Sequence, residues 1–191
     1  MYLRIAYLLL GIIFIIAGIA FVLPHAAPHK TAPMLTLTSS AFAENGAIPG
    51  RYTCDGANTN PELSIANVPA AAKSLALIMD DPDIPESVKA ARGIDVFDHW
   101  VVFNMPPSAK TLAASSTPPG VEGRNGAGGV GYTGPCPPDR EHRYFFTLYA
   151  LDAMLPLPSG ATKQEVQAAM AGHVIESAEL VGRYNRPQNA Q

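Results

Sequence analysis

The chain opens with an uninterrupted apolar segment, residues 5–23, which contains no charged or strongly polar side chain and directly follows Arg4. Folded as a helix, this segment would be roughly 28 Å long, close to the hydrocarbon thickness of a bilayer. Two interpretations fit: a signal anchor that stays in the membrane, or a signal peptide that is removed. Residues 24–27 offer no clear small-residue cleavage site, and the apolar run is longer than in most signal peptides, so the uncleaved anchor is favoured. A buried core helix is the least favoured interpretation.

The charge beside this segment predicts its orientation. Arg4 is expected to stay on the cytoplasmic side, because basic residues next to a membrane segment are retained there. The rest of the chain would then lie outside the cytoplasm, anchored to the inner membrane and facing the periplasm, or secreted. We therefore divide the chain into a signal anchor or signal peptide (1–24), a Pro-rich tether (25–33), one domain (34–186) and a short tail (187–191).

Composition narrows the class of partner. Charged residues make up only 15% of the 191 residues, the net charge is -3, and no basic cluster is visible. Nucleic acid is therefore not an expected partner, because binding it requires a concentration of Lys and Arg. The 18 Pro and 16 Gly are spread along the chain, which is typical of a folded, loop-rich domain and not of a disordered tract.

Short apolar stretches between turn residues predict a mainly β domain. One helix is predicted near the C-terminus, where Thr162 and Glu165 have capping-box spacing and apolar residues follow at helical intervals up to Gly172. Residues 113–138 form a long Gly/Pro-rich stretch without periodicity, and an ordered loop of that length usually serves a function. Several short strands with one or two helices favour a β-sandwich with peripheral helices. The predicted strands are 34–38, 74–79, 98–105, 143–151 and 174–184.

A first group of polar side chains, Asp80, Asp81 and Asp83, follows the predicted strand 74–79. Carboxylates at this spacing can hold a divalent metal ion. Prolines between and after the acids fix the local backbone, so a simple turn is the favoured interpretation.

A histidine stands in the strand predicted for residues 98–105. Alternation places His99 on the same face as Val101, Phe103 and Met105. A histidine on such an apolar face is usually a structural residue of the core or its rim. It becomes a candidate for ligand binding only where another polar group points towards it.

A third position supplies such polar groups. His142 and Tyr144 are two residues apart and share a strand face with Phe146 and Leu148. An imidazole and a phenol in this arrangement can converge on one small ligand, and their donors suit phosphate or carboxylate oxygens. Glycines just before them, including Gly134, could let the backbone approach such a ligand closely. A polar strand start after a rigid loop explains the same pattern about equally well.

The two cysteines, Cys54 and Cys136, fit the predicted compartment. A space outside the cytoplasm permits a disulfide between them, and closing so long a loop could stabilise the fold by a few kcal/mol. Two separate buried thiols are the alternative, and the residues alone do not decide. Without CxxC spacing the pair is a poor zinc signal.

Taken in order, four motifs resemble the phosphatidylethanolamine-binding protein family, and above all its bacterial branch, described as Raf-kinase-inhibitor-like. Order and spacing agree over about residues 35–183, which is nearly all of the predicted domain. The resemblance implies two antiparallel sheets with Greek-key connections and a C-terminal helical element. The motifs are RYTCDG at 51–56, DPDIP at 81–85, FDHWVVFNMPP at 97–107 and GYTGPCPPDREHRYFFTLYAL at 131–151.

The resemblance also implies a small pocket at one end of the domain for phosphate-like or other anionic groups. It brings Cys54 and Cys136 into loops on the same side, which favours the disulfide. It further implies that Asp83 and Arg143 are structural, with Arg143 on the opposite face and paired with an acid. Glu62 departs from the family pattern and is expected to make the pocket rim more acidic. The implied pocket residues are Asp81, His99, Gly134, Pro135, His142 and Tyr144.

These features predict an anion-binding protein with a regulatory role and without enzymatic activity, catalytic residues, a cofactor or a metal. The partners expected are a small anion or phospholipid head group, and the membrane through the N-terminal segment. Because histidines would hold the anion, affinity is expected to rise below about pH 6.5. Two alternatives stay open: a metal-dependent hydrolase using Asp81, His99 and His142, and a protein-interaction module, such as a protease inhibitor, that acts through surface loops.

Overall fold

The computed structural model describes residues 34–187. The predicted membrane segment (1–24), the tether (25–33) and all but the first residue of the predicted tail lie outside the described residues. Within 34–187, no helix is both long enough and apolar enough to cross a membrane.

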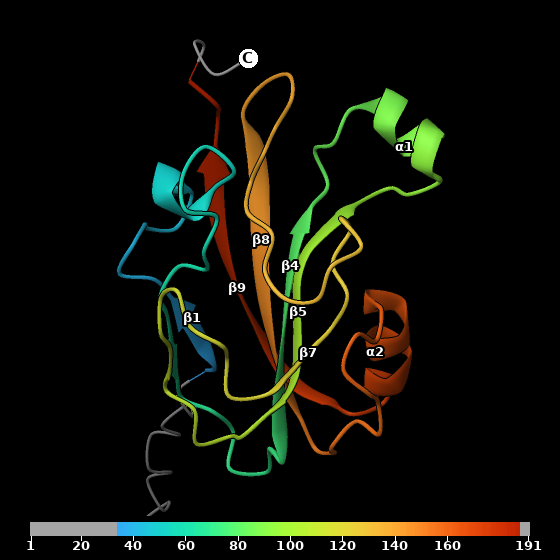
Figure 1. The fold of residues 1–191 in the computed structure, drawn as a ribbon. Helices are drawn as coiled ribbons and strands as arrows, with labels where there is room; N and C mark the ends of the chain where they lie inside the picture. Colours follow the sequence, from blue (N-terminus) through green and yellow to red (C-terminus); the bar gives the residue numbers. More distant parts are fainter. Residues whose placement is uncertain (1–33, 188–191) are drawn as a thin grey trace, which may run out of the picture. The chain divides into compact units, whose positions relative to one another are not determined.

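The described residues fold into two β-sheets that pack against each other (Figure 1). All strand pairs are antiparallel except that β2 pairs with β9 in parallel. The prediction of a mainly β fold with two sheets is thus confirmed, with this one correction to the expected antiparallel pairing. One sheet has the strand order β1 (Thr36–Thr38), β3 (Leu63–Ala66), β6 (Thr111–Leu112). The other has the order β2 (Gly46–Ala47), β9 (Val174–Tyr184), β8 (His142–Leu151), β4 (Ser74–Asp81), β5 (Phe97–Met105), β7 (Val121–Glu122).

The main core lies between the two sheets. β8 alternates buried and more exposed side chains, as expected for a strand with one face on a core. β4 is apolar on consecutive positions because both of its faces are buried. The core side chains of these two strands are Leu75, Leu77, Met79, Tyr144, Phe146 and Leu148.

A second apolar cluster lies on the other face of the large sheet, under helix α2 (Lys163–Met170). The predicted capping box is confirmed: Thr162 Oγ1 accepts from the Glu165 amide, and the Glu165 carboxylate accepts from the Thr162 amide. Lys163 also fastens α2 to the sheet, because its Nζ lies 3.0 Å from Asp80 Oδ1 and 2.5 Å from Asp98 Oδ1.

The long strands agree with the prediction to within two residues, whereas short elements were missed. Helix α1 (Glu86–Arg92) has no fully buried residue, so it gives no apolar periodicity in the sequence. It begins after Pro85 and ends at Gly93, which adopts the left-handed conformation with φ 65°. Figure 1 shows α1 standing beyond the ends of β4 and β5, beside the region described next.

The prediction that His99 shares a face with Val101, Phe103 and Met105 is wrong. Met79 pairs with Trp100 but Asp80 pairs with Asp98, so the register shifts around His99, as at a β-bulge. The His99 ring packs on Tyr144 of the main core, whereas Val101 and Phe103 belong to the cluster under α2. Asn104, with φ 56°, changes the alternation again and returns Met105 to the main core.

Candidate functional site

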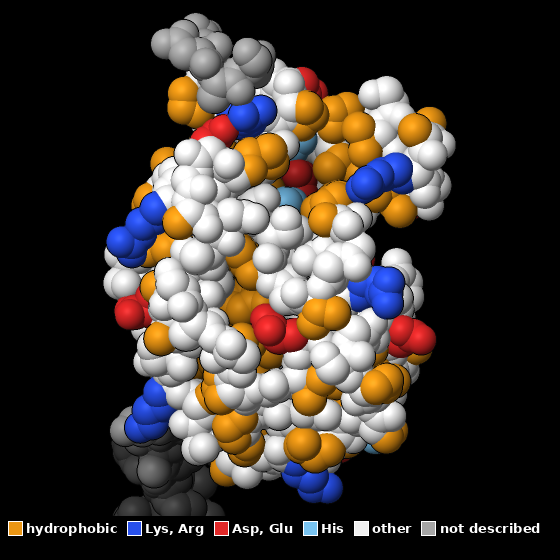
Figure 2. Space-filling view, in the orientation of Figure 1, with side chains coloured by type: hydrophobic (Ala, Val, Ile, Leu, Met, Phe, Trp, Pro, Cys, Tyr) orange, Lys and Arg blue, Asp and Glu red, His pale blue; other side chains and the backbone are white. Residues whose placement is uncertain are grey.

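The ends of three neighbouring strands place the polar side chains of interest together. β4 runs antiparallel to β5 and β8, so its last residue, Asp81, lies beside the first residues of both neighbours. Asp81, Phe97 and His142, from the ends of these three strands, line a cavity of about 220 Å³. Figure 2 shows this hollow, with histidine and acidic side chains at its base and hydrophobic side chains on the α1 side. The lining residues are Asp81, Ile84, Pro85, Val88, Arg92, Phe97, His99, Thr133, Gly134, Cys136, Pro138 and His142.

His142 lies between two carboxylates. Its Nδ1 is 2.7 Å from Asp81 Oδ2 and its Nε2 is 2.8 Å from Asp139 Oδ1. The His142 side chain is fully buried, and burial alone would lower its pKa. The two carboxylate hydrogen bonds outweigh that effect and raise the pKa of His142 above its usual value, while His142 lowers the pKa of Asp139. Because an ionised carboxylate only accepts hydrogen bonds, this geometry favours a His142 ring that donates from both nitrogens, as an imidazolium does.

His99 has the opposite character. Its Nδ1 lies 2.7 Å from the carbonyl oxygen of Thr133, which can only accept, so Nδ1 carries the proton. Burial lowers the pKa of His99 and is only partly offset by that hydrogen bond. The ring is thus neutral near pH 7, and its Nε2 lone pair can accept a hydrogen bond. The cavity wall therefore holds one charged and one neutral imidazole.

Two of the six implied pocket residues do not line the cavity. Tyr144 is fully buried beneath it, edge-on to the His99 ring with 5.1 Å between ring centroids. Its hydroxyl is buried without a hydrogen-bond partner among the described residues, and burial raises its pKa. Pro135 is also buried, and its carbonyl accepts from the amide of Cys54.

Gly134 lines the cavity, but its amide already donates to Asn58 Oδ1 at 2.7 Å. A Cβ on Gly134 would lie 2.5 Å from the carbonyl oxygen of Tyr52, so only glycine permits this close contact between two loops. The same two loops are joined by a disulfide between Cys54 and Cys136. The structure therefore has the bonded pair and not two separate thiols.

The three aspartates near the end of β4 have separate partners. Asp80 pairs with Lys163 under α2, and Asp81 pairs with His142 in the cavity. Asp83 forms a two-pronged ion pair with Arg143, at 2.7 and 2.8 Å, which lowers the pKa of Asp83 to about 2. Arg143 thus lies on the face opposite the pocket and pairs with an acid, as expected. Within the described residues, no group of three or more His, Cys, Asp or Glu is arranged to hold a metal ion.

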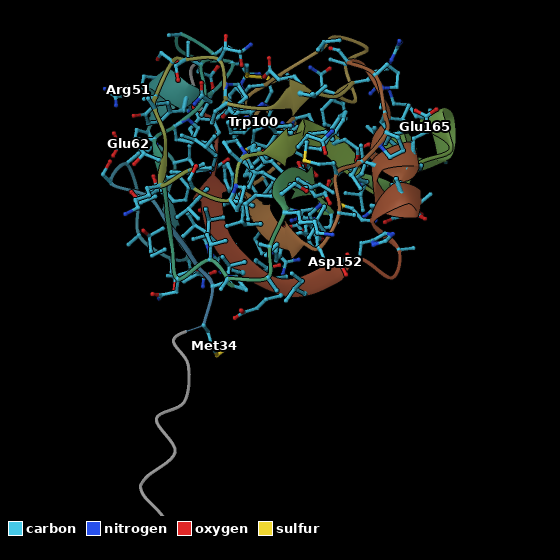
Figure 3. The ribbon with its side chains drawn as sticks, turned by 90° about the horizontal axis from the view of Figure 1, so that it is seen from below. Met34, Arg51, Glu62, Trp100, Asp152 and Glu165 are labelled. Atoms are coloured by element: carbon cyan, nitrogen blue, oxygen red, sulfur yellow. A yellow bond between two sulfur atoms is a disulfide. The ribbon has the colours of Figure 1, made fainter. Side chains whose placement is uncertain are left out.

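Several functional candidates were missed from the sequence. Asp139 contacts His142, which follows it by three residues. Asp139 lies on a loop, where a spacing of three residues does not predict a contact. Arg92 and Val88 reach the cavity only because α1 stands beside it. Glu62 was wrongly expected at the pocket rim: its carboxylate accepts from Ser40 at 2.9 Å, and Figure 3 shows it pointing outward.

A larger open cleft of about 570 Å³ lies between the end of α1 and the start of α2. Its most buried charged group, Lys163, is already neutralised by Asp80 and Asp98. The smaller cavity is the better candidate site because four of the six pocket residues implied by the family resemblance line it: Asp81, His99, Gly134 and His142.

Comparison with known proteins agrees with this architecture. A UPF0098 protein of Methanothermobacter thermautotrophicus is 50% identical over 158 residues, which is 80% of this chain and 99% of that protein. A protein of Chlamydia trachomatis described as a phosphatidylethanolamine-binding protein homologue has a similar structure, with a TM-score of 0.76 and 44% identity over 81% of this chain and 99% of that chain. YbcL of Escherichia coli gives a TM-score of 0.72 at 28% identity, over 81% and 100% of the two chains.

The family profile described as phosphatidylethanolamine-binding protein matches residues 38–185, so it covers every strand except most of β1, both helices and every residue of the cavity. The chain therefore belongs to the phosphatidylethanolamine-binding protein family.

Proposed function

We propose that this family member is a membrane-tethered binding protein whose cavity takes a phosphate or a phosphate-bearing head group. The observation that supports this most directly is the position of His142 in the cavity wall between two carboxylates that raise its pKa. A buried cation interacts more strongly with an anion than an exposed one does, because water screens it less. The family name is consistent with a ligand of the phospholipid head-group class.

The rest of the cavity suits a small organic anion. Arg92 adds a second positive charge at the rim, where its guanidinium lies 5.7 Å from the centre of the Phe97 ring. Ile84, Val88 and Phe97 give an apolar wall for the carbon atoms of a head group. The neutral His99 can accept a hydrogen bond from an amine or hydroxyl of the same ligand. We propose binding, and not catalysis, as the role of these groups.

The pKa shifts of the two cavity histidines refine the pH dependence that we propose. Because the pKa of His142 is raised, its charge is present below the ordinary value of about 6.5 and is lost only as the pH rises through a higher value. His99 has a lowered pKa and stays neutral there. Anion affinity should therefore be highest below about pH 6.5 and fall as the pH rises through the pKa of His142 in the folded protein.

Calorimetric titration of the full-length protein tests this proposal. Phosphorylethanolamine and inorganic phosphate should bind saturably near pH 6, bind more weakly near pH 9, and fail to bind to His142→Ala. His173→Ala is the matched control, because His173 is an exposed histidine that pairs with Asp152 away from the cavity. Absence of saturable binding at both pH values would contradict the proposal.

The proposed location rests on residues 5–23 and on Arg4. We expect the full-length chain to sediment with membranes and to resist extraction at alkaline pH, and the chain that lacks residues 1–33 to be released. A protease added to intact spheroplasts should digest the domain if it faces the periplasm. Protection of the domain from that protease would contradict the proposed orientation.

A further inference from the structure

The ring nitrogen through which His142 would bind an anion is already occupied. Nδ1 is held by Asp81, whose side chain is 4% exposed, so only Nε2 is left as a donor. Asp139 Oδ1 accepts from that Nε2 at 2.8 Å. A ligand oxygen that is to receive a hydrogen bond from His142 must therefore take the place of the Asp139 carboxylate.

Charge makes the competition stricter. Asp81, His142 and Asp139 together carry one negative charge, which would repel a second anion. Once Asp139 has moved away, Asp81 and His142 are neutral as a pair, and the ligand contributes the second anion that the imidazolium can hold. Asp139 and the ligand thus exclude each other on electrostatic grounds as well as on steric ones.

Asp139 can leave at low cost, whereas Asp81 cannot. The Asp139 side chain is 44% exposed and lies on the loop before β8. Its other partners belong to the next residue: the Arg140 amide donates to Oδ1 at 3.0 Å, and Arg140 Nε lies 4.0 Å from Oδ2. The Arg140 guanidinium also donates to the carbonyl oxygens of Asp83 and Glu141, so it does not depend on Asp139 for a partner.

We propose that Asp139 is a displaceable carboxylate that occupies the anion position on His142 and so decides which anions the cavity accepts. A monoanionic carboxylate offers His142 no more than Asp139 already does. A phosphate dianion offers more charge and more acceptor oxygens, so it can displace Asp139. The cavity is thereby selective for phosphate groups over simple carboxylates. This inference rests on the proposed function and adds the residue that sets its selectivity.

The test compares full-length wild-type protein with Asp139→Asn by calorimetric titration with inorganic phosphate and with acetate near pH 6, below the ordinary pKa of histidine, because the substitution also removes one of the two carboxylates that raise the pKa of His142. An Asn side chain can still accept from Nε2 but brings no charge, and hydrogen bonds to charged acceptors are stronger than those to neutral ones. Phosphate affinity should therefore rise by about fivefold or more in the variant, and acetate should become a measurable ligand. Asp139→Glu keeps the carboxylate and should behave like the wild type.

Asp152→Asn is the matched control, because Asp152 is an exposed aspartate 2.8 Å from His173 in a pair outside the cavity. It removes the same charge and should leave phosphate affinity unchanged. A second readout follows displacement directly: phosphate should change the carboxyl carbon resonance of Asp139 in the wild type, which a purely structural residue would not show.

The outcomes separate this inference from the proposed function. Phosphate binding that is equal or weaker in Asp139→Asn would overturn the role of Asp139 and leave the anion cavity standing. Absence of phosphate binding in both proteins would overturn both. An equal gain in Asp152→Asn would show that overall charge, and not displacement at His142, explains the effect.

Discussion

At the scale of single residues, the two cavity histidines differ because their ring nitrogens meet different partners. Carboxylates on both sides keep His142 charged despite complete burial. His99 meets one carbonyl oxygen and the aromatic rings of Phe97 and Tyr144, so burial keeps it neutral. Two groups of the same chemical type thus supply a donor and an acceptor to one small space.

Because the two pKa values are shifted in opposite directions, folding stability should pass through a maximum near pH 6.5. The raised pKa of His142 contributes stability that is present below about pH 6.5 and lost as the pH rises through its folded value. The lowered pKa of His99 contributes stability that is present above about pH 6.5 and lost as the pH falls. The free energy of unfolding, measured in urea between pH 5 and 8.5, should therefore decrease on both the acidic and the alkaline side of about pH 6.5. His142→Gln should flatten the alkaline side; a wild-type alkaline slope in that variant would contradict this account.

The two aspartates of the DPD motif should respond differently to the same substitution. Asp83→Asn removes the ion pair with Arg143, which is 47% exposed, and should cost about 1 kcal/mol of unfolding free energy while leaving anion affinity intact. Asp81→Asn removes a carboxylate that keeps His142 charged, so it should lower the pKa of His142 and weaken phosphate binding. Chemical denaturation and calorimetry on both variants measure the contrast. Equal losses of affinity would argue against separate roles.

At the scale of elements, α2 is held to the sheet by apolar packing and by one buried ion pair network. Lys163 is the first residue of the helix, its side chain is 10% exposed, and it lies between Asp80 of β4 and Asp98 of β5. Asp98 directly precedes His99, so the same network supports the strand segment that carries this histidine. The helix therefore stabilises the cavity from the far face of the sheet.

Replacing Lys163 should destabilise the fold strongly, because it leaves two partly buried carboxylates without a counter-charge. Lys163→Met is expected to cost about 2 kcal/mol or more of unfolding free energy. Gln164→Met, an exposed neighbour on the same helix, should change stability by less than about 0.5 kcal/mol. Thermal and urea unfolding measure both. A small effect of Lys163→Met would mean that apolar packing alone fastens α2.

Some elements could be predicted from the sequence because their local pattern matches their environment. β8 alternates inward and outward side chains from His142 to Ala150, so His142 and Tyr144 were correctly placed on one face. β5 does not, because the register shift at His99 and the positive φ of Asn104 break the alternation. A bulge depends on the neighbouring strand, and no pattern within one strand indicates it.

The cavity was predicted only in part for a related reason. Residues on regular strands, Asp81 and His142, could be assigned by motif and alternation. Asp139 contacts His142 from a loop. Arg92 reaches the cavity from α1, a helix without a fully buried residue. Tyr144 was correctly assigned to its face, but its burial depth depends on the packing of His99 above it. The face on which a strand side chain lies follows from alternation, whereas the depth to which it is buried depends on how the two sheets pack.

At the scale of the whole molecule, the cavity depends on two loops that are distant in sequence. One contains Cys54 and Asn58, and the other contains Gly134 and Cys136. The contacts that join them include the disulfide, the hydrogen bond from the Gly134 amide to Asn58, and the hydrogen bond from the Cys54 amide to the Pro135 carbonyl at 3.0 Å. Because Gly134 and Cys136 both line the cavity, these contacts also fix part of its wall.

The disulfide should therefore contribute both to global stability and to ligand affinity. It joins residues 82 positions apart, and removing a crosslink over so long a loop typically costs a few kcal/mol. The double variant Cys54→Ala, Cys136→Ala should unfold at markedly lower temperature and bind phosphate more weakly, since the loop that carries Gly134 is held less firmly. Asn58→Ala is the comparison that loosens the same loop without touching the disulfide, and it should reduce affinity with a smaller loss of stability. If the cysteine variant loses stability but keeps full affinity, then the hydrogen bonds alone hold the cavity wall and the disulfide serves the fold only.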